Sequence, residues 1–407
     1  MTILLERGMF MYDFKTVYDR KKDGSMKWDC VCESQNCDCL DCFPLTMADM
    51  DFQICPKIKD GLSEYIQGHV LGYTMPTQNY LNTVASYLSD RFDFQVDPDW
   101  ILTTPGVVSA IAAGIRALSE PGQGVIVFSP VYNPFYEQVE YSGRQLIKCP
   151  MLIDDTGKYK LDLDLFKKLA SDANNRLLIF CSPHNPGGRV WSKEEIQAVS
   201  DLCIKHDLHV ISDEIHGDLA LKGNKHYSFP AVHSEMAQRT IVCSAASKAY
   251  NIAGLQCSNI VIANAEIREK FEEALASFGI QQANALGLKA TEIAYKDCQD
   301  WLEEAKVAVE TNHALVVDFF ESWGSRWKVM PQEASFMAWI NYQEYDILPE
   351  DMIHLLCDQC HFYVNDGRMY GPEGEGWIRL NVGLPTEELR GLLKRFKAKF
   401  EEKITQL

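Results

Sequence analysis

The stretch "TIVCSAASKAYNIAGLQCSNI", residues 240 to 260, decides the fold. It places one lysine, Lys248, among alanines and serines directly after the β-branched run that begins at Thr240, a run typical of a buried strand. No acidic residue within the stretch balances its charge. An amine attacks a carbonyl only when it is unprotonated, and burial lowers the pKa of an amine. We therefore interpret Lys248 as a lysine that forms a Schiff base with an aldehyde.

The segments around this stretch repeat its pattern. A capping-box signal, Ser192 with Glu195, predicts a helix between two short apolar runs that lack polar alternation. Such runs are typical of strands covered on both faces. Strands alternating with helices predict an α/β fold with a mostly parallel sheet and helices on both sides. The five runs are residues 124–132, 176–186, 208–216, 240–248 and 258–264.

The same reasoning divides the chain. Residues 51–290 are predicted to form the large domain. Residues 291–407 mix helical stretches, such as 387–404, with short strands, such as 377–383, and predict a smaller α+β domain. Residues 1–50 are interpreted as an arm that contributes to the small domain.

Composition excludes several classes of partner. A chain of 407 residues with 46% hydrophobic content has enough apolar residues for a large core. Its formal net charge of -18 argues against broad binding to nucleic acid or to an anionic membrane. We find neither a signal-peptide pattern near residue 1 nor an apolar stretch that approaches 18 residues. We expect a cytoplasmic protein.

Five of the 14 cysteines cluster in "CVCESQNCDCLDC", residues 30–42. Only Cys39 and Cys42 have the spacing of a zinc knuckle, and a second knuckle is missing. We interpret the cluster as reduced thiols in a loop insertion and expect no metal site. Metal binding and redox bridging are the alternatives.

Polar residues follow the predicted strands where each one ends. They are Tyr132, Asn185, Asp213, His216 and Lys248. The carboxyl edge of an open α/β sheet is where ligands bind, so these side chains are expected in one crevice. Pyridoxal phosphate requires a lysine, an acid at its ring nitrogen, a flat face and a phosphate cradle.

Each requirement has a candidate and a simpler alternative. Asp213 is predicted to keep the ring nitrogen protonated, or it caps a helix. Tyr132 is predicted to stack on the ring, or it is a core aromatic. Asn185 is predicted to donate to the ring oxygen, or it forms an Asn-Pro-Gly turn.

The candidates for binding the phosphate and the substrate carboxylate come from other parts of the chain. The backbone amides of Gly106, Val107 and Val108 open a helix and are candidates for binding phosphate. A lone glycine at a helix start is a weak signal. Arg379 is predicted to pair with a substrate carboxylate, or it is an ordinary surface arginine.

Taken together, the motifs resemble fold type I pyridoxal-phosphate enzymes of the aminotransferase class I/II superfamily. Within that group they are similar to the carbon-sulfur lyases, the cystathionine beta-lyases and the cystalysin-like cysteine desulfhydrases. The match runs in order from about residue 24 to 385. The motifs are "PLTMADMDF", "LGYTMPT", "SPVYNPF", "SPHNPGGRVW", "SDEIHGDL", "SAASKAYNIAGL" and "IRLNVGLP".

The resemblance implies pyridoxal 5'-phosphate, a seven-stranded sheet, and a homodimer whose active site is shared between subunits. It implies that Tyr73 reaches the phosphate of the neighbouring subunit. The remaining implied roles are Lys248 bonded to the cofactor, Asp213 on the ring nitrogen, His216 beside the ring, Asn185 near the phenolic oxygen, Ser247 at the phosphate and Arg379 on the substrate carboxylate.

Three positions depart from the family pattern. Ala245 stands where many relatives carry a phosphate-binding Ser or Thr, which leaves Ser244, Ser247 and backbone amides for that task. Asn133 replaces an aromatic or His after the stacking tyrosine. Gln256 stands where related enzymes often use Arg.

The predicted reaction is β-elimination on L-cystathionine, L-cysteine or another cysteine S-conjugate. Lys248 would remove the α-proton, and loss of the thiolate would lead to pyruvate and ammonia, with hydrogen sulfide released from cysteine. Lys248 or a tyrosine is the candidate proton donor to the leaving sulfur. An amino-acid aminotransferase is the first alternative, and a regulatory protein that binds the cofactor and acts through a partner is the second.

Overall fold

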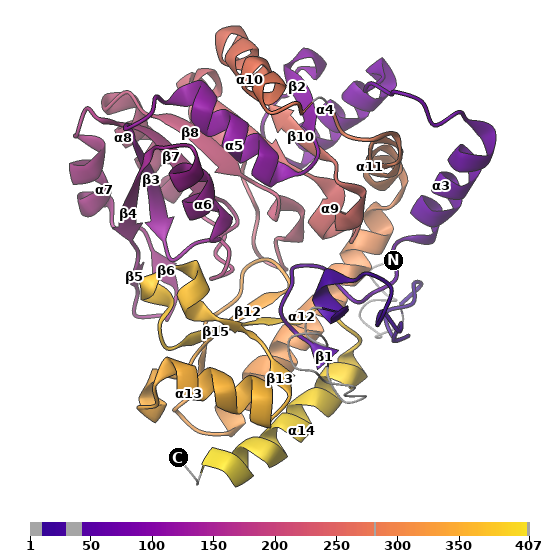
Figure 1. The fold of residues 1–407 in the computed structure, drawn as a ribbon, viewed down its shortest axis with the longest axis vertical. Coiled ribbons are helices and arrows are strands. Elements are labelled where there is room, and N and C mark those ends of the chain that lie inside the picture. The colour runs from indigo at the N-terminus through magenta and orange to yellow at the C-terminus, as the bar shows by residue number, and fades with distance from the viewer. Residues whose placement is uncertain (1–9, 30–42, 281, 405–407) are drawn as a thin grey trace. The chain divides into compact units, whose positions relative to one another are not determined.

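The computed structural model describes residues 10–29, 43–280 and 282–404 (Figure 1). The chain forms two compact units. Unit 1 consists of Met1–Gln53, Pro186–Gly188 and Glu303–Leu407, and unit 2 consists of Ile54–Asn185 and Arg189–Leu302. The cysteine-rich segment from Cys30 to Cys42 lies outside the described residues.

A seven-stranded sheet forms the centre of unit 2, in the order β2-β10-β9-β8-β7-β3-β4. Neighbouring strands are parallel except for the two pairs that β10 makes, which are antiparallel. The predicted mostly parallel sheet is therefore confirmed. Its strands are β2 (Ile101–Thr104), β3 (Gly124–Ser129), β4 (Gln145–Pro150), β7 (Asn175–Cys181), β8 (His209–Asp213), β9 (Thr240–Ser244) and β10 (Ser258–Val261).

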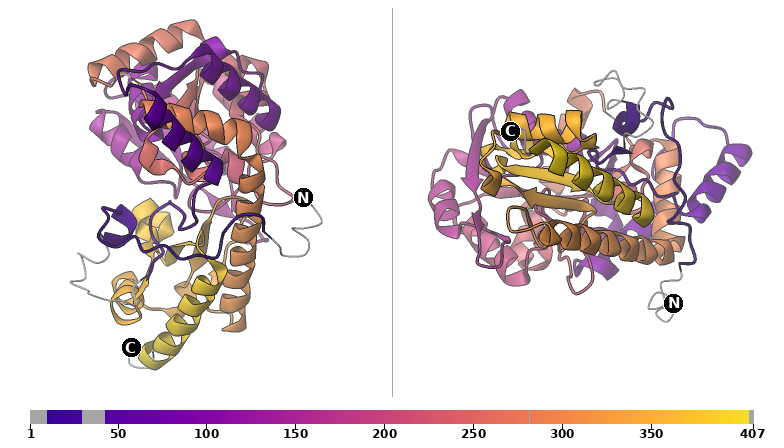
Figure 2. Two further views of the ribbon diagram at one scale, coloured as in Figure 1. Left: turned by 90° about the vertical axis from the view of Figure 1, so that its right-hand side faces the viewer. Right: turned by 90° about the horizontal axis from the view of Figure 1, so that it is seen from below.

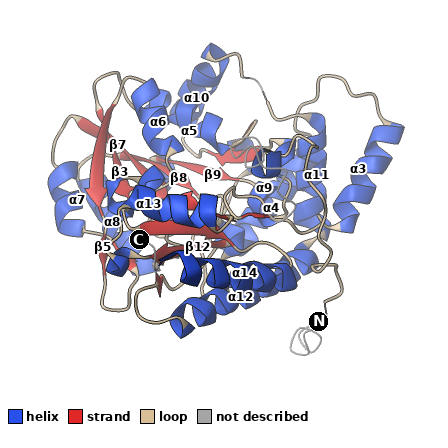
Figure 3. Cartoon of the chain, turned by 60° about the horizontal axis from the view of Figure 1, so that its bottom comes forward, coloured by secondary structure: helices blue, strands red, loops and turns tan. Residues whose placement is uncertain are grey.

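Helices cover both faces of this sheet (Figure 3). On one face α5 (Val107–Leu118) and α10 (Ala265–Ser277) lie side by side (Figure 1), and both contribute to the main core cluster. A Cβ at Gly114 of α5 would lie 2.8 Å from Cδ1 of Ile211, so the glycine allows α5 to approach the sheet closely. The other face is covered by α7 (Leu163–Ala170) and α8 (Lys193–Lys205).

Local sequence signals set the helix starts. The Ser192 side chain accepts from the backbone N–H of Glu195, and the Glu195 side chain accepts from the N–H of Ser192, so the predicted capping box of α8 is present. The other helices of unit 2 are α3 (Pro56–Gly68), α4 (Gln78–Phe92), α6 (Pro134–Tyr141), α9 (Ala246–Ala249) and α11 (Ala285–Asp297), and a small hairpin is formed by β5 (Leu152–Ile153) and β6 (Tyr159–Lys160).

Unit 1 contains an antiparallel sheet in the order β11-β12-β15-β14. Its strands are β11 (Lys328–Val329), β12 (Met337–Asn341), β14 (Asn365–Asp366) and β15 (Trp377–Asn381). A second, parallel pair joins β1 (Phe43–Pro44) to β13 (Phe362–Tyr363), so the segment that follows residue 42 packs on the C-terminal part of the chain.

Two long helices complete unit 1, and Figure 2 shows them side by side. The helix α12 (Gln299–Ser322) packs against α14 (Thr386–Lys403) through aromatic rings, among them Phe319 on Phe396. The shorter α13 (Pro349–Ile353) lies between β12 and β13 in the sequence. Throughout the described ranges, we find no helix with the length and apolar character that crossing a membrane requires.

Candidate active site

Three neighbouring parallel strands of unit 2 end at the same level. Asp213, the last residue of β8, pairs in register with Cys181 of β7 on one side and with Cys243 of β9 on the other. The segments that leave these strand ends carry Asn185, His216 and Lys248. This register brings the segments that follow the three strands to one edge of the sheet, the edge at which ligands bind in open α/β sheets.

Asp213 is a buried acid, with 5% of its surface exposed. Its Oδ1 accepts a hydrogen bond of 3.1 Å from the N–H of Ile215, so it does cap the following turn. Burial raises the pKa of the carboxyl to about 7, and the neighbouring charge of Glu214 adds to the rise. The Ile215 N–H and the charge of Lys248 act in the opposite direction, and burial outweighs both.

Lys248 lies in α9, a four-residue helix that directly follows β9. Its other residues are two alanines and Ser247, and both Lys248 and Ser247 are partly buried. Ala245, the residue that precedes α9, is buried. Because it is an alanine, this position supplies no side-chain hydroxyl. The small residues leave Lys248 as the one long side chain of α9 itself.

A buried hydrogen-bond network holds the end of α9. Tyr250, its C-cap residue, is fully buried, and its hydroxyl lies 3.0 Å from the hydroxyl of Tyr87. Tyr87 donates to Oδ1 of Asp218 at 2.7 Å, so Tyr250 is the donor to Tyr87. Arg91 pairs with the same oxygen of Asp218 at 2.8 Å. The lysine-bearing helix is thereby tied to α4 and to the loop after β8.

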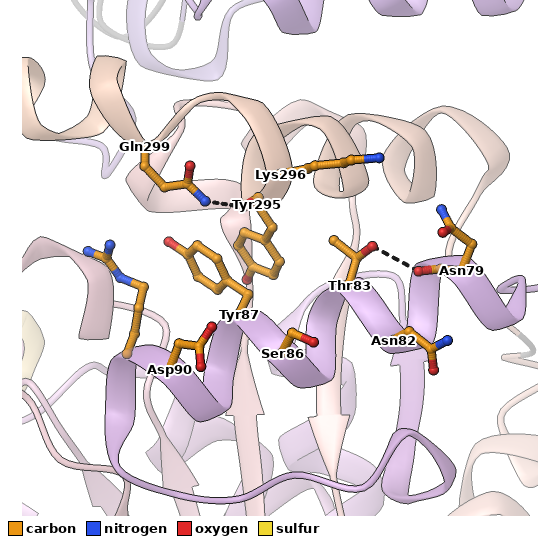
Figure 4. A pocket seen from close by; sticks show the side chains of 10 residues that line it. Asn79, Asn82, Thr83, Ser86, Tyr87, Asp90, Tyr295, Lys296 and Gln299 are labelled. Carbon is orange, nitrogen blue, oxygen red and sulfur yellow. Dashed lines mark hydrogen bonds between the residues drawn. The ribbon is translucent and has the colours of Figure 1, made fainter.

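The outer side of this network borders a groove of ≈ 420 Å³ (Figure 4). Tyr87 stacks on Tyr295 with ring centroids 3.8 Å apart, and Gln299 donates to the carbonyl oxygen of Tyr295. Figure 4 shows the groove between α4 and the chain around Tyr295. It is lined by Asn79, Asn82, Thr83, Ser86, Tyr87, Asp90, Arg91, Tyr295, Lys296 and Gln299.

The remaining crevice candidates are all at least partly buried. Tyr132 is partly buried and makes an edge contact with Phe135 at a centroid distance of 5.9 Å. Asn185 and His216 are buried at 6% and 3% exposure. The backbone N–H of Asn185 donates to the sulfur of Cys181 at 3.4 Å, which fixes the start of its turn.

The predicted phosphate cradle is a true helix start. Gly106 is the N-cap of α5 and has a φ of 101°, a conformation that favours glycine. The first N–H groups of a helix lack partners within the helix, so they are available for an anion. A Cβ at position 106 would lie 3.7 Å from Oε1 of Gln256, so the glutamine side chain borders this end of α5.

Arg379 belongs to unit 1, on β15. It is 5% exposed, which excludes the surface-arginine alternative. Its Nη2 donates to the carbonyl oxygen of Thr46 and to Oδ1 of Asn365, both at 2.9 Å, and its guanidinium lies 5.0 Å from the ring centroid of Tyr370. The arginine is therefore held in place by its own unit.

Tyr73 stands apart from the crevice residues of unit 2. It lies in the irregular segment between α3 and α4 and is fully exposed, as is most of Val70. A groove of ≈ 660 Å³ runs beside it, lined by Leu71–Met75 and Gln282–Leu286.

Comparison with known proteins agrees with this geometry. The sequence pattern described as aminotransferase class I and II matches residues 41–396. The chain belongs to the aminotransferase class I and II family. This confirms the family inferred from the motifs. The chain is 36% identical to cystathionine beta-lyase PatB of Bacillus subtilis over 92% of its own length and 96% of that protein.

Solved structures of similar proteins extend the comparison. Cystalysin from Treponema denticola, whose structure contains pyridoxal 5'-phosphate, superposes with a TM-score of 0.94 at 36% identity, covering 97% of this chain and 100% of that one. A C-S lyase from Staphylococcus hominis with bound pyridoxal phosphate superposes with a TM-score of 0.88 at 25% identity, covering 96% and 98%. The predicted fold class is confirmed.

Sequence reasoning missed a buried acid next to Asp213. Glu214 follows Asp213 and is 2% exposed. Its Oε1 accepts from the hydroxyls of Ser212 at 2.8 Å and Ser228 at 3.1 Å, and from the N–H of Phe229 at 2.8 Å. Its Oε2 lies 3.2 Å from Nε2 of His226. Nothing in the residue spacing signals these partners, because Ser228 and Phe229 arrive through a loop.

Proposed function

We propose that the chain is a pyridoxal 5'-phosphate-dependent carbon-sulfur β-lyase. Its substrates are L-cystathionine, L-cysteine or related cysteine S-conjugates, and its products are a thiol or hydrogen sulfide, pyruvate and ammonia. The observation that carries the proposal is the buried carboxyl of Asp213 beside Lys248, in a chain similar to lyases over nearly its full length.

The residues present fit the cofactor. A buried carboxyl with a raised pKa suits a protonated ring nitrogen, because such a cation would offset the cost of burying the charge. The glycine N-cap of α5 suits a phosphate, with the first amides of that helix as donors. Gln256 at the same end brings an amide instead of the positive charge that an arginine would supply.

Pyridoxal phosphate, when bound, supplies the electron sink that makes the α-proton of an amino acid acidic. Lys248 binds the cofactor and then accepts that proton on its amine. Asp213 keeps a proton on the ring nitrogen. The amides of Gly106, Val107 and Val108, with the hydroxyl of Ser247, bind the phosphate.

The other predicted residues position the reactants. Tyr132 covers the ring face, Asn185 donates to the ring oxygen, and His216 lies beside the ring. Arg379 pairs with the substrate carboxylate, for which its fixed guanidinium is suited. These roles remain proposals for mutagenesis.

We also propose that the protein is a homodimer whose active sites are shared, with Tyr73 of one subunit at the phosphate of the other. The segment around Tyr73 supports this, because Val70, Leu71 and Met75 are exposed apolar side chains beside a groove. Sedimentation analysis of the intact protein tests the dimer. Mixing Lys248→Ala with Tyr73→Ala subunits should restore part of the activity, because one of the two sites in a mixed dimer is intact.

A coupled assay tests the reaction. Pyruvate formed in proportion to L-cystathionine consumed supports the lyase, whereas amino transfer to a keto acid without pyruvate supports the aminotransferase alternative. Absence of turnover together with a specific protein partner supports the regulatory alternative. The cytoplasmic location and the domain boundaries at residues 50 and 290 stay predictions.

A further inference from the structure

A pair of cysteines lies at one end of the α3 and α11 helix pair. Cys55 is the N-cap of α3, and Cys298 is the C-cap of α11. Both are buried with 0% exposure, and their thiols form a hydrogen bond to each other. Neither residue belongs to the candidate active site.

The packing of the two helices brings these ends together. A Cβ at Gly61 of α3 would lie 2.5 Å from Cδ1 of Ile293 of α11, so the helices are in close contact there. About one turn earlier on α3, Lys57 donates to the carbonyl oxygen of Asp297 at 2.6 Å and pairs with Asp300 at 3.3 Å. The helices therefore run antiparallel, and Cys55 lies beside Cys298, next to the contacts that Lys57 makes with Asp297 and Asp300.

The environment of the pair distinguishes its two thiols. The backbone N–H of Ile58 donates to the carbonyl oxygen of Cys55 at 3.0 Å. The Lys57 ammonium lies within electrostatic range of both sulfurs. The hydrogen bond between the thiols lowers the pKa of Cys55 and raises the pKa of Cys298, because Cys298 is the donor. Cys55 is therefore the more acidic of the two thiols and the better candidate for the attacking sulfur.

Cys55 and Cys298 lie far apart in the sequence, so a disulfide between them would close a long loop. Cys55 lies just after the chain passes from unit 1 into unit 2, and Cys298 lies just before it returns at Glu303. A bond between them would close residues 55–298, nearly all of unit 2, into one covalent loop. Such a bond constrains the unfolded chain most strongly when the loop is long.

We propose that Cys55 and Cys298 are a redox modification site that forms a reversible disulfide with a small-molecule disulfide as oxidant. The Cys55 thiolate attacks one sulfur of the oxidant, which forms a mixed disulfide and releases one thiolate. The sulfur of Cys298 then attacks Cys55, and its proton leaves with the second oxidant thiol. Two protein thiols are oxidised, and one small disulfide is reduced to two thiols.

Local opening of α3 gives the oxidant access. Ile58 is the one buried side chain of this 13-residue helix, so few apolar contacts hold it. Elements with few buried contacts open at a lower free energy than the core. The matched control is Cys203 of α8, which is equally buried but has a raised pKa caused mainly by burial.

The test exposes cofactor-loaded protein to bis(2-hydroxyethyl) disulfide at pH 7.5, quenches with acid, alkylates the free thiols and maps peptides by mass spectrometry. We expect a peptide that joins Cys55 to Cys298, is released by dithiothreitol and forms at least about tenfold faster than any adduct on Cys203. The Cys203→Ser variant should form the same bond at the same rate.

Single variants of the pair separate its two steps. In Cys298→Ser, Cys55 should retain a mercaptoethanol adduct, because the second thiol is missing. In Cys55→Ser, Cys298 should be recovered as a free thiol. Recovery of Cys55 and Cys298 as free thiols from the treated parent protein, or pairing of Cys55 with a different cysteine, overturns the proposal. None of these readouts depends on catalytic activity.

Discussion

The positive charge of Lys248 partly offsets the cost of burying the carboxyl of Asp213, although the two residues follow different strands of the sheet. The parallel register of β8 and β9 ends both strands at one level, and α9 continues from there with Lys248. The chemistry that we propose depends on this relationship, because a proton acceptor and a buried acid serve two ends of one cofactor.

Replacing Asp213 with Asn tests the acid directly. The variant keeps the shape and the hydrogen-bond acceptor for Ile215 but removes the charge that holds a proton on the ring nitrogen. We expect lyase kcat/KM to fall by about 10²- to 10³-fold with the fold intact. Asp201→Asn, at an exposed position of α8, is the control and should leave kcat/KM unchanged. Full activity of Asp213→Asn would contradict the assigned role.

The same carboxyl predicts how the stability of the cofactor-free protein depends on pH. Its folded-state pKa of about 7 lies above the value near 3.9 expected in the unfolded chain, so the folded state holds a proton that the unfolded state releases. The resulting stabilisation is complete below about pH 4 and is lost as the pH rises through about 7.

Three units of pKa correspond to a loss of up to about 4 kcal/mol in the free energy of unfolding. Urea unfolding at several pH values, in parallel with Asp213→Asn, measures this contribution as the difference between the two proteins. Identical pH profiles for the parent and the variant would refute it.

Gly106→Ala tests the phosphate cradle. Its φ of 101° strains any residue with a Cβ, so we expect a loss of about 1 to 3 kcal/mol in unfolding free energy and weaker cofactor binding. Gly122→Ala is the matched control, because Gly122 has a φ of 84° and open space around it. It should lose stability yet bind the cofactor as the parent does. Equal loss of cofactor affinity in both variants would show that strain alone is responsible.

Glu214 is predicted to stabilise the fold, so that removing its carboxylate lowers the free energy of unfolding. In Glu214→Ala the hydroxyls of Ser212 and Ser228 and the N–H of Phe229 lose their buried acceptor, so unfolding free energy should fall by about 3 to 5 kcal/mol. Glu273→Ala, at an exposed position of α10, should change it by less than about 0.5 kcal/mol. Chemical unfolding measures both, and similar values for the two variants would contradict the burial argument.

The fold was predictable wherever a residue pattern was local. Apolar runs located the central strands, and the capping box of Ser192 and Glu195 located the start of α8. Strand order was not predictable, because pairing of β2 with β10 joins residues far apart in the sequence, and nothing in either strand specifies its neighbour. The antiparallel direction of β10 follows from the same long-range pairing.

The positions of Asp213 and Lys248 in the fold were predictable, because Asp213 ends β8 and Lys248 follows β9. The supporting network was not. Tyr87 lies on α4, and its contacts with Asp218 and Tyr250 arise only when the helix packs on the sheet. Likewise, the thiol pair of Cys55 and Cys298 depends on the packing of α3 against α11 and leaves no spacing signal in the sequence.

The most direct test of the central claim is a pyruvate assay on purified protein with L-cystathionine, read together with the visible absorbance of bound cofactor and repeated on Lys248→Ala. We expect a visible band and stoichiometric pyruvate from the parent, and loss of both from the variant. Pyruvate formation by Lys248→Ala at the parent rate, or a parent protein that binds no pyridoxal phosphate, would contradict the assignment.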